Sequence, residues 1–211
     1  MEYRLIIFDF DGTLGDTFPW FTRVLNQVAD KYRFKHVTAA EVDTIRGYEG
    51  RQILKHLGVP VWKAPLIANY LRTLMTRDIR EVTLFDGIKE MLHSLLNSGI
   101  ELAVVSSNAA ENIGYVLGQE LATLFTHYEC GVSMFGKERK LRSILKKSSH
   151  SATDAIYIGD EIRDLHSARK IGLAFGAVSW GYNKIEAIKI HHPDYIFETV
   201  TDITTTLIAD H

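Results

Sequence analysis

The stretch Leu5-Ile6-Ile7-Phe8-Asp9-Phe10-Asp11-Gly12-Thr13-Leu14 decides the fold of this 211-residue chain. Its short apolar run, closed by a polar cluster, is typical of a buried strand in a parallel sheet. Two carboxylates, Asp9 and Asp11, follow the strand, and Gly12 lets the chain turn sharply behind them. Two carboxylates placed in this way can divide nucleophilic and acid/base work between them.

Two further apolar runs have the same form: residues 102–105 end before Ser106, and residues 155–158 end before Gly159. Segments with a helical period alternate with these runs, which predicts a doubly wound, Rossmann-like α/β fold around a parallel sheet. The order of the strands does not follow from the sequence. We expect helices at 88–97, 109–121, 140–147 and 161–171, and two more strands at 173–178 and 195–197.

The interval from Gly15 to Thr83 breaks the alternation, because it is longer than a strand-to-helix connection requires. It carries helical signals almost throughout, punctuated by glycine and proline. We therefore expect an inserted α-helical cap domain over residues 16–83, with residues 1–15 and 84–211 forming the α/β catalytic core. The four helices expected within the cap span residues 20–34, 39–45, 51–57 and 61–76.

The composition is ordinary for a globular chain, with 46% hydrophobic residues, 24% charged residues and a net charge of -2. Neither disorder nor binding to nucleic acid is favoured. The single cysteine, Cys130, cannot form an internal disulfide, which fits a reducing compartment. No apolar run suits a signal peptide or a membrane span, so we expect a cytoplasmic protein without a membrane partner, as a monomer or homodimer.

In open α/β sheets, ligands gather beyond the carboxyl ends of the strands. Ser106-Ser107-Asn108 occupies such a position and precedes a predicted helix, so its hydroxyls and the helix-terminal N–H groups would face an anion. The alternative is a helix cap, a role for which Ser and Asn are common. Because Ser106-Ser107-Asn108, like Asp9, directly follows a predicted strand, we favour anion binding.

Lys137 opens the basic run Gly136-Lys-Glu-Arg-Lys-Leu-Arg and offers a fixed positive charge to an anionic group. Further along, Gly159-Asp160-Glu161-Ile162-Arg163-Asp164 ends the third strand with carboxylates that suit a hard cation. Asp160 is the expected ligand. Asp164 lies one helical turn later, where it either supports the metal shell or caps the helix and pairs with Arg163.

In this order, Asp9-x-Asp11-Gly-Thr-Leu, Ser106, Lys137 and Gly159-Asp160-x-x-x-Asp164 resemble the motifs of the haloacid dehalogenase-like hydrolase superfamily. The likeness covers nearly the whole chain, and the insertion is similar to the helical cap of the phosphoglycolate phosphatase-like branch. Two positions depart from the pattern. No proline-containing string follows Lys137, so Lys140 is a competing assignment. Glu161 stands where relatives often have Ser or Thr, and either alters metal or substrate preference or pairs with a cation.

The resemblance implies a magnesium-dependent phosphatase that hydrolyses a small phosphorylated metabolite through an aspartyl-phosphate. Asp9 would attack phosphorus, while Asp11 would protonate the leaving oxygen and later activate water. Mg²⁺, Lys137 and the Ser106 hydroxyl would stabilise the charge of the phosphoryl group. The implied metal-binding residues are Asp9, Phe10 through its carbonyl, Asp11, Asp160 and Asp164. The implied substrate-binding residues are Gly12, Thr13, Ser107, Asn108, Arg46 and Arg51.

Arg46 and Arg51 lie in a glycine-containing loop of the insertion, where a guanidinium could pair with a carboxylate of the substrate. The alternative is a surface turn with solvated arginines. Trp180-Gly181-Tyr182 follows the expected strand 173–178. Its aromatic side chains either line the substrate pocket or pack within the protein. His191-His192 has no partner at metal-ligand spacing, which favours a solvated loop over a zinc site.

Two other functions use related chemistry. A phosphomutase or phosphotransferase would employ the same Asp9 but deliver the phosphoryl group to a second acceptor, and the motifs do not separate it from a phosphatase. A non-catalytic phosphate-binding module would be expected to lack Asp9, Asp11 or Asp160, and all three are present.

Overall fold

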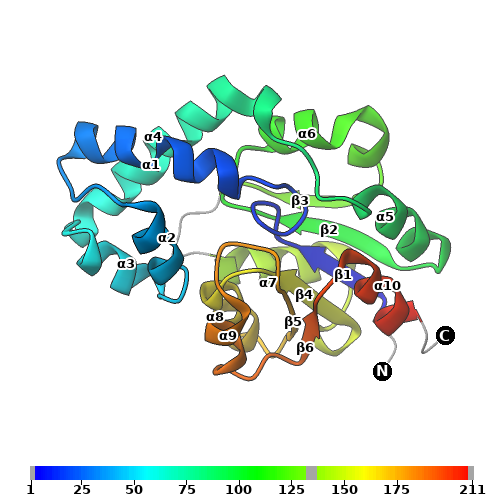
Figure 1. The fold of residues 1–211 in the computed structure, drawn as a ribbon. Helices are drawn as coiled ribbons and strands as arrows, with labels where there is room; N and C mark the ends of the chain where they lie inside the picture. The colour runs from blue at the N-terminus through cyan, green and yellow to red at the C-terminus, as the bar shows by residue number, and fades with distance from the viewer. Residues whose placement is uncertain (1–2, 132–136, 209–211) are drawn as a thin grey trace.

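The computed structural model describes residues 3–131 and 137–208. Within them, one parallel sheet has the strand order β3-β2-β1-β4-β5-β6 (Figure 1). This confirms the predicted doubly wound α/β fold. The strands are β1 (Leu5–Phe8), β2 (Glu101–Val105), β3 (His127–Glu129), β4 (Ala155–Gly159), β5 (Ala174–Val178) and β6 (Tyr195–Phe197).

The first strand lies in the middle of the sheet, with Leu5 opposite Glu101 of β2 on one side and Ala155 of β4 on the other. The chain builds outward from β1 through β2 to β3, then returns to build β4, β5 and β6 on the opposite side. The border between β1 and β4 is therefore the point where the direction of winding reverses, and ligands of such folds bind in the crevice there. Asp9 and Asp160 immediately follow these two strands.

Helices cover both faces of the sheet (Figure 1). Ile6 and Phe8 of β1 pack with helices on one face, whereas Leu5 and Ile7 pack with those on the other. All four side chains are fully buried, which explains the continuous apolar run in the sequence. The first face carries α5 (Ile88–Asn97), α6 (Ala110–Ala122) and α10 (Val200–Ile208); the second carries α7 (Lys137–Ser148), α8 (Ile162–Arg169) and α9 (Ile185–Lys189).

Four helices inserted between β1 and α5 lie beside the sheet, at the left of Figure 1. They enclose two hydrophobic clusters whose fully buried members all lie between Trp20 and Val82. The two chain segments that join the insertion to the sheet run side by side, since Asp16 N–H donates to Thr83 O at 2.8 Å. The helices are α1 (Phe18–Tyr32), α2 (Ala39–Ile45), α3 (Gly50–His56) and α4 (Ala64–Asp78), with 3₁₀ turns at Val61–Lys63 and Ile79–Glu81.

Local sequence explains where these helices begin. Thr38 and Glu41 form a capping box at the start of α2. The expected helix over 61–76 begins instead as a 3₁₀ turn after Pro60, and α4 starts at Ala64 with Pro65 in its first turn, where a proline is tolerated. The division into a core and a cap at residues 15 and 84 stays a prediction.

Three elements are absent from the sequence prediction, and several helix boundaries differ from it by two or three residues. The strand β3 and the helices α9 and α10 were not expected, and α7 begins three residues earlier than predicted, at Lys137. The strand β3 is short and half-buried at the sheet edge, so it lacks a strong apolar signal. Of the helices that the structure describes, none combines the length and the apolar character needed to cross a membrane.

Candidate active site

The carboxylate of Asp9 lies at the carboxyl end of β1 and is 1% exposed. Its Oδ1 accepts a hydrogen bond from Phe10 N–H at 2.8 Å, and its Oδ2 lies 2.7 Å from Lys137 Nζ. Burial raises the pKa of Asp9 to about 8; Lys137 opposes the rise, and the carboxylates of Asp164 and Asp11 add to it. The carboxylate of Asp9, whose ionisation is disfavoured by burial, therefore lies beside the buried ammonium of Lys137.

Lys137 is the first residue of α7, and its Nζ contacts both Asp9 and Asp164, the latter at 2.6 Å. Burial lowers the pKa of Lys137, but these carboxylates outweigh burial and hold the pKa above its usual value. Lys140 lies one turn later, with its partly exposed side chain 2.9 Å from Glu129. The structure thus brings Lys137, and not Lys140, to Asp9.

Asp160 follows β4 and is fully buried. Its Oδ1 accepts from Thr13 Oγ1 at 3.1 Å, and its Oδ2 accepts from Tyr182 N–H at 2.7 Å. Burial raises the pKa of Asp160 well above its usual value, and the nearby carboxylates of Glu161 and Asp9 raise it further. Asp160 is therefore held in place by hydrogen bonds while its negative charge is only weakly compensated.

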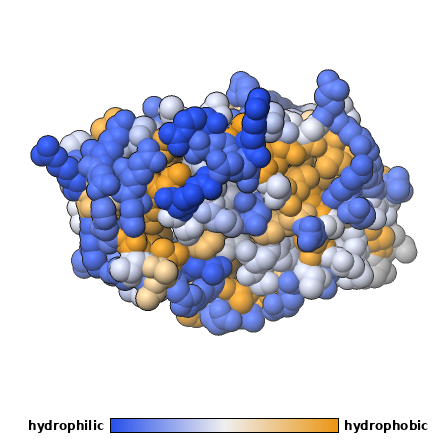
Figure 2. All heavy atoms as spheres, turned by 45° about the horizontal axis from the view of Figure 1, so that its top comes forward, coloured by the Kyte–Doolittle hydropathy of each residue, from blue (hydrophilic) through white to orange (hydrophobic). Residues whose placement is uncertain are grey.

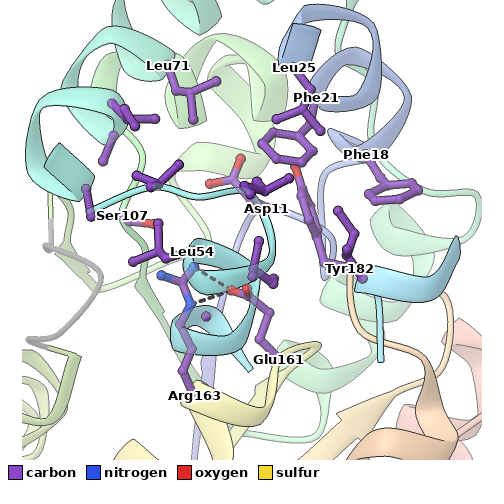
Figure 3. Close-up of a pocket in the computed structure, with 18 of the residues that line it drawn as sticks. Asp11, Phe18, Phe21, Leu25, Leu54, Leu71, Ser107, Glu161, Arg163 and Tyr182 are labelled. Atoms are coloured by element: carbon purple, nitrogen blue, oxygen red, sulfur yellow. Dashed lines mark hydrogen bonds and ion pairs between the residues drawn. The ribbon is translucent and has the colours of Figure 1, made fainter. Parts of the chain in front are cut away.

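Asp164 is also fully buried, on the first turn of α8. One oxygen contacts Lys137, whereas Oδ2 has no hydrogen-bond partner among the described residues. Arg163 pairs with Glu161 and not with Asp164, so Glu161 does have the cation partner that the sequence left open (Figure 3). Asp164 therefore faces inward with one oxygen uncommitted.

Asp9, Asp160 and Asp164 each offer a carboxylate oxygen, and these oxygens lie within 4.8 Å of one another. The ammonium of Lys137 contacts two of these three buried carboxylates, those of Asp9 and Asp164, which leaves an excess of negative charge. Carboxylate oxygens are the ligands that a hard divalent cation prefers. The unpartnered Asp164 oxygen and this donor set fit such a cation.

The main-chain oxygen of Phe10 does not join this cluster. It accepts hydrogen bonds from the N–H groups of Thr13, Leu14 and Gly15, and these bonds close the turn after Asp9. The expectation that the Phe10 carbonyl binds the metal is corrected on this ground, because its lone pairs are already used. The carbonyl of Asp11 accepts no hydrogen bond from the residues that the structure describes.

Asp11 carries its carboxylate into a cavity (Figure 3). Asn108 Nδ2 donates to one carboxylate oxygen at 2.9 Å, and Ser106 Oγ donates to the other at 3.3 Å. Burial raises the pKa of Asp11, and these two hydrogen bonds oppose the rise. Asn108 also accepts from Ala109 N–H at 2.8 Å, so it acts as a local cap as well as a partner of Asp11. Ser107 lines the same cavity.

Two glycines lie against Asp160. A Cβ at Gly12, whose φ is 77°, would lie 2.3 Å from Asp160 Oδ2, and one at Gly181 would lie 2.1 Å from Asp160 Cβ. Both contacts are shorter than van der Waals packing allows, so neither position accepts a side chain without displacing the carboxylate. Trp180 donates its indole N–H to Thr13 O at 3.1 Å and so braces the same turn.

Arg46 joins the insertion to the loop that follows β5. Its Nη2 donates to Gly181 O at 2.8 Å and its Nε to Tyr182 O at 3.0 Å. Asn183 returns a hydrogen bond to Arg46 O at 2.8 Å. Arg51, by contrast, is exposed and does not line the cavity. Sequence reasoning did not single out Asn183, because its role depends on a contact between segments 137 residues apart.

His191 has spatial partners that its sequence neighbours do not reveal. Single donor atoms of His191, His166 and Glu49 lie within 4.8 Å of one another, with the two imidazole rings edge to face at 5.0 Å. The three side chains are partly exposed and come from α8, the segment after α9 and the insertion. These partners lie far from His191 in the sequence, and the preference for a solvated loop over a zinc site stays a prediction.

The family model described as haloacid dehalogenase-like hydrolase matches residues 6–178, so the chain belongs to that family. The phosphoglycolate phosphatase of Synechococcus elongatus is 29% identical over 201 residues, which cover 95% of each chain. The pyrophosphatase PpaX of Oceanobacillus iheyensis is 26% identical, with 97% of each chain covered. The protein is thus an enzyme, a hydrolase that acts on phosphate esters, as its sequence predicts.

Among solved structures, that of a predicted phosphatase from Clostridium acetobutylicum superposes with a TM-score of 0.83 at 22% identity. The match covers 99% of this chain and all of the other. This likeness confirms the fold over the whole length of the chain, including the insertion.

Proposed function

We propose that the protein is a magnesium-dependent phosphatase that hydrolyses a small-molecule phosphomonoester through an aspartyl-phosphate on Asp9. The observation that carries the proposal is the buried pairing of Asp9 with Lys137, next to an Asp11 that faces the cavity. This arrangement supports the proposal that Asp9 is the nucleophile and Asp11 the acid and base. Phosphoglycolate phosphatases among the relatives support the same reaction class.

In the first step, an Asp9 oxygen forms a bond to phosphorus while the ester P–O bond breaks. Asp11 donates a proton to the leaving alcohol oxygen. In the second step, Asp11 takes a proton from water as the water oxygen attacks phosphorus, which releases inorganic phosphate and returns Asp9 to its carboxylate form. Ser106 and Asn108 hold the Asp11 carboxylate in place for both transfers.

Lys137 supplies one positive charge beside the reacting carboxylate throughout. Asp9, Asp160 and Asp164, together with the free main-chain oxygen of Asp11, would hold the magnesium ion. Bound there, Mg²⁺ would neutralise the carboxylates and the phosphoryl oxygens, which would otherwise repel one another. Thr13 holds Asp160 by a hydrogen bond from the facing turn, and Gly12, which has no side chain, leaves room for the Asp160 carboxylate.

Ser107 and Asn108 are the proposed contacts for the phosphoryl oxygens, because they line the cavity beside Asp11 and lead into α6. Arg46 contributes by holding the loop at Gly181 and Tyr182. Arg51 has no place in this arrangement. The proposed partner is a small phosphorylated metabolite. A cytoplasmic location and a monomeric or homodimeric state stay predictions.

The test is release of inorganic phosphate from 4-nitrophenyl phosphate by the purified protein, with and without Mg²⁺. Equal amounts of 4-nitrophenol and phosphate indicate hydrolysis, whereas phosphate recovered on an added alcohol indicates the phosphotransferase alternative. Asp9→Asn should abolish turnover, because an amide is a poor nucleophile, and rapid acid quenching of the wild type should leave a phosphorylated peptide containing Asp9. Turnover retained by the purified Asp9→Asn variant would refute the mechanism.

A further inference from the structure

A cavity of about 350 Å³ lies between the insertion and the sheet, and Asp11, Ser107 and Asn108 lie on its lining. Its size falls in the range of pockets that bind organic ligands. The cavity therefore opens directly onto the residues that would handle the phosphoryl group. A leaving group attached to that phosphoryl group would extend from Asp11 toward the helices of the insertion.

Most of the lining beyond the phosphoryl end is apolar. It comes from all four helices of the insertion, with Leu25 on α1 and Leu71 on α4 drawn across from Asp11 in Figure 3. On the face drawn in Figure 2, apolar areas lie between hydrophilic ones. The aromatic members of the cavity lining include Phe18, Trp20, Phe21 and Phe34.

The cationic side chains of the lining are mostly engaged elsewhere. Among the described lining residues these are Arg46, Arg72 and Arg163. Arg46 donates to two main-chain oxygens, and Arg163 pairs with Glu161. Arg72 makes a hydrogen bond of 3.5 Å to Asn69 and, like Arg46, has no anionic partner in the part of the chain described; unlike the Arg46 guanidinium, its guanidinium donates to no main-chain oxygen there. A two-carbon acid such as glycolate would leave most of the apolar lining uncovered.

On the basis of the proposed phosphatase function, we propose that the physiological substrate is a phosphomonoester of an apolar alcohol. Its hydrocarbon would lie among the side chains of the insertion. Water in a cavity with such walls gains few hydrogen bonds, so an apolar group that displaces it is favoured. Each methylene that becomes fully buried is expected to improve kcat/KM by up to about fourfold, the factor that corresponds to its transfer from water.

The test is a series of ethyl, butyl and hexyl phosphates, whose leaving alcohols have similar reactivity, assayed beside phosphoglycolate. From ethyl to hexyl phosphate, kcat/KM should rise by on the order of tenfold to a hundredfold. Hexyl phosphate should be preferred over phosphoglycolate. A flat series, or a preference for phosphoglycolate that Arg72→Ala removes, would overturn the inference while leaving the phosphatase function intact.

Two variants separate the cavity wall from general effects on stability. Leu71→Ser should lower kcat/KM for hexyl phosphate far more than for ethyl phosphate, and so flatten the chain-length series. Leu96→Ser is the matched control, because Leu96 is equally half-buried but packs on the sheet cluster outside the cavity. It should leave the series intact. If both variants flatten the series equally, the effect does not come from the cavity and the inference fails.

Calorimetric titration with hexylphosphonate and phosphonoacetate, in the presence of Mg²⁺, measures binding to the cavity independently of catalysis. Hexylphosphonate should bind more tightly, and Leu71→Ser should weaken it selectively. Tight binding without turnover of any ester would support the apolar site and refute the phosphatase function. No preference for hexylphosphonate, together with no turnover, would overturn both.

Discussion

Tyr182 donates its main-chain N–H to Asp160, while its main-chain oxygen accepts a hydrogen bond from Arg46. One peptide segment therefore contacts a carboxylate of the proposed metal site and a guanidinium of the insertion. Any displacement of the insertion that breaks the Arg46 contacts would also loosen the support of Asp160. The substrate cavity and the charged site are connected through this loop.

Replacing Arg46 by Ala should lower kcat/KM for all phosphomonoesters by on the order of tenfold, because two charge-assisted hydrogen bonds to the loop are lost. The loss should be similar for phosphoglycolate and for hexyl phosphate. Arg51→Ala is the control, since the Arg51 side chain is exposed and outside the cavity lining. A selective rise in the KM for phosphoglycolate in Arg51→Ala would restore the carboxylate-binding role that the sequence suggested.

Replacing Lys137 by Ala should reduce kcat by at least about a hundredfold, a loss typical of removing a contact that stabilises transition-state charge. Lys140→Ala should have little effect on kcat, because the Lys140 side chain pairs with Glu129 and does not contact Asp9. Steady-state kinetics of both variants with 4-nitrophenyl phosphate make the comparison. Equal losses would leave neither lysine with the proposed role.

Metal removal should silence the enzyme reversibly, because few protein groups hold the ion. Mg²⁺ at a hundred times its Kd should add about 2.7 kcal/mol to the free energy of unfolding, which corresponds to a melting temperature several degrees higher. Asp160→Asn should lose most of this increment. Thermal unfolding with and without Mg²⁺ measures the effect without any substrate. Activity that survives exhaustive chelation would contradict the metal assignment.

Acid should weaken the fold in part through Glu129 on β3. Burial raises the pKa of Glu129, but hydrogen bonds from Lys147, Lys140 and Ser143 outweigh burial and bring the pKa to about 2. Because the folded-state pKa lies below the unfolded one, this stabilisation is present above about pH 4.5 and is lost as the pH falls toward 2. The expected contribution is on the order of 2 kcal/mol.

The Glu129→Gln variant should therefore unfold in urea with a free energy that depends less on pH between 5 and 2 than that of the wild type. Glu186→Gln serves as the control, since Glu186 is exposed and makes no ion pair with a described residue. Parallel pH profiles for wild type and Glu129→Gln would show that the lysine contacts do not stabilise the folded state.

The sequence predicted the strands that carry chemistry because each couples an uninterrupted apolar run to a polar cluster. The contact of Asp160 with Thr13 follows from the convergence of such strand ends. Lys137 and Lys140 remained alternatives because they lie in one basic run. What separates them is the start of α7, which a pattern of charges does not define.

The role of Tyr182 and the cavity in the insertion depend on three-dimensional contacts that cannot be predicted from the residue types alone. Tyr182 acts through its main chain, so its side chain gives no signal of its role toward Asp160. The apolar residues of the insertion have the same period whether they fill its interior or line a cavity. Leu54 in fact does both, since it belongs to a buried cluster and to the lining.

The groups proposed to handle phosphate belong to the sheet and its loops, whereas the apolar part of the cavity wall comes from one continuous segment, α1 to α4. Substitutions in that segment can reshape the space for the alcohol without touching the residues that break the ester bond. Chemistry and selectivity can therefore diverge at different rates during evolution. Such a division allows relatives to align along nearly the whole chain and yet bear different names, phosphoglycolate phosphatase in one case and pyrophosphatase in another.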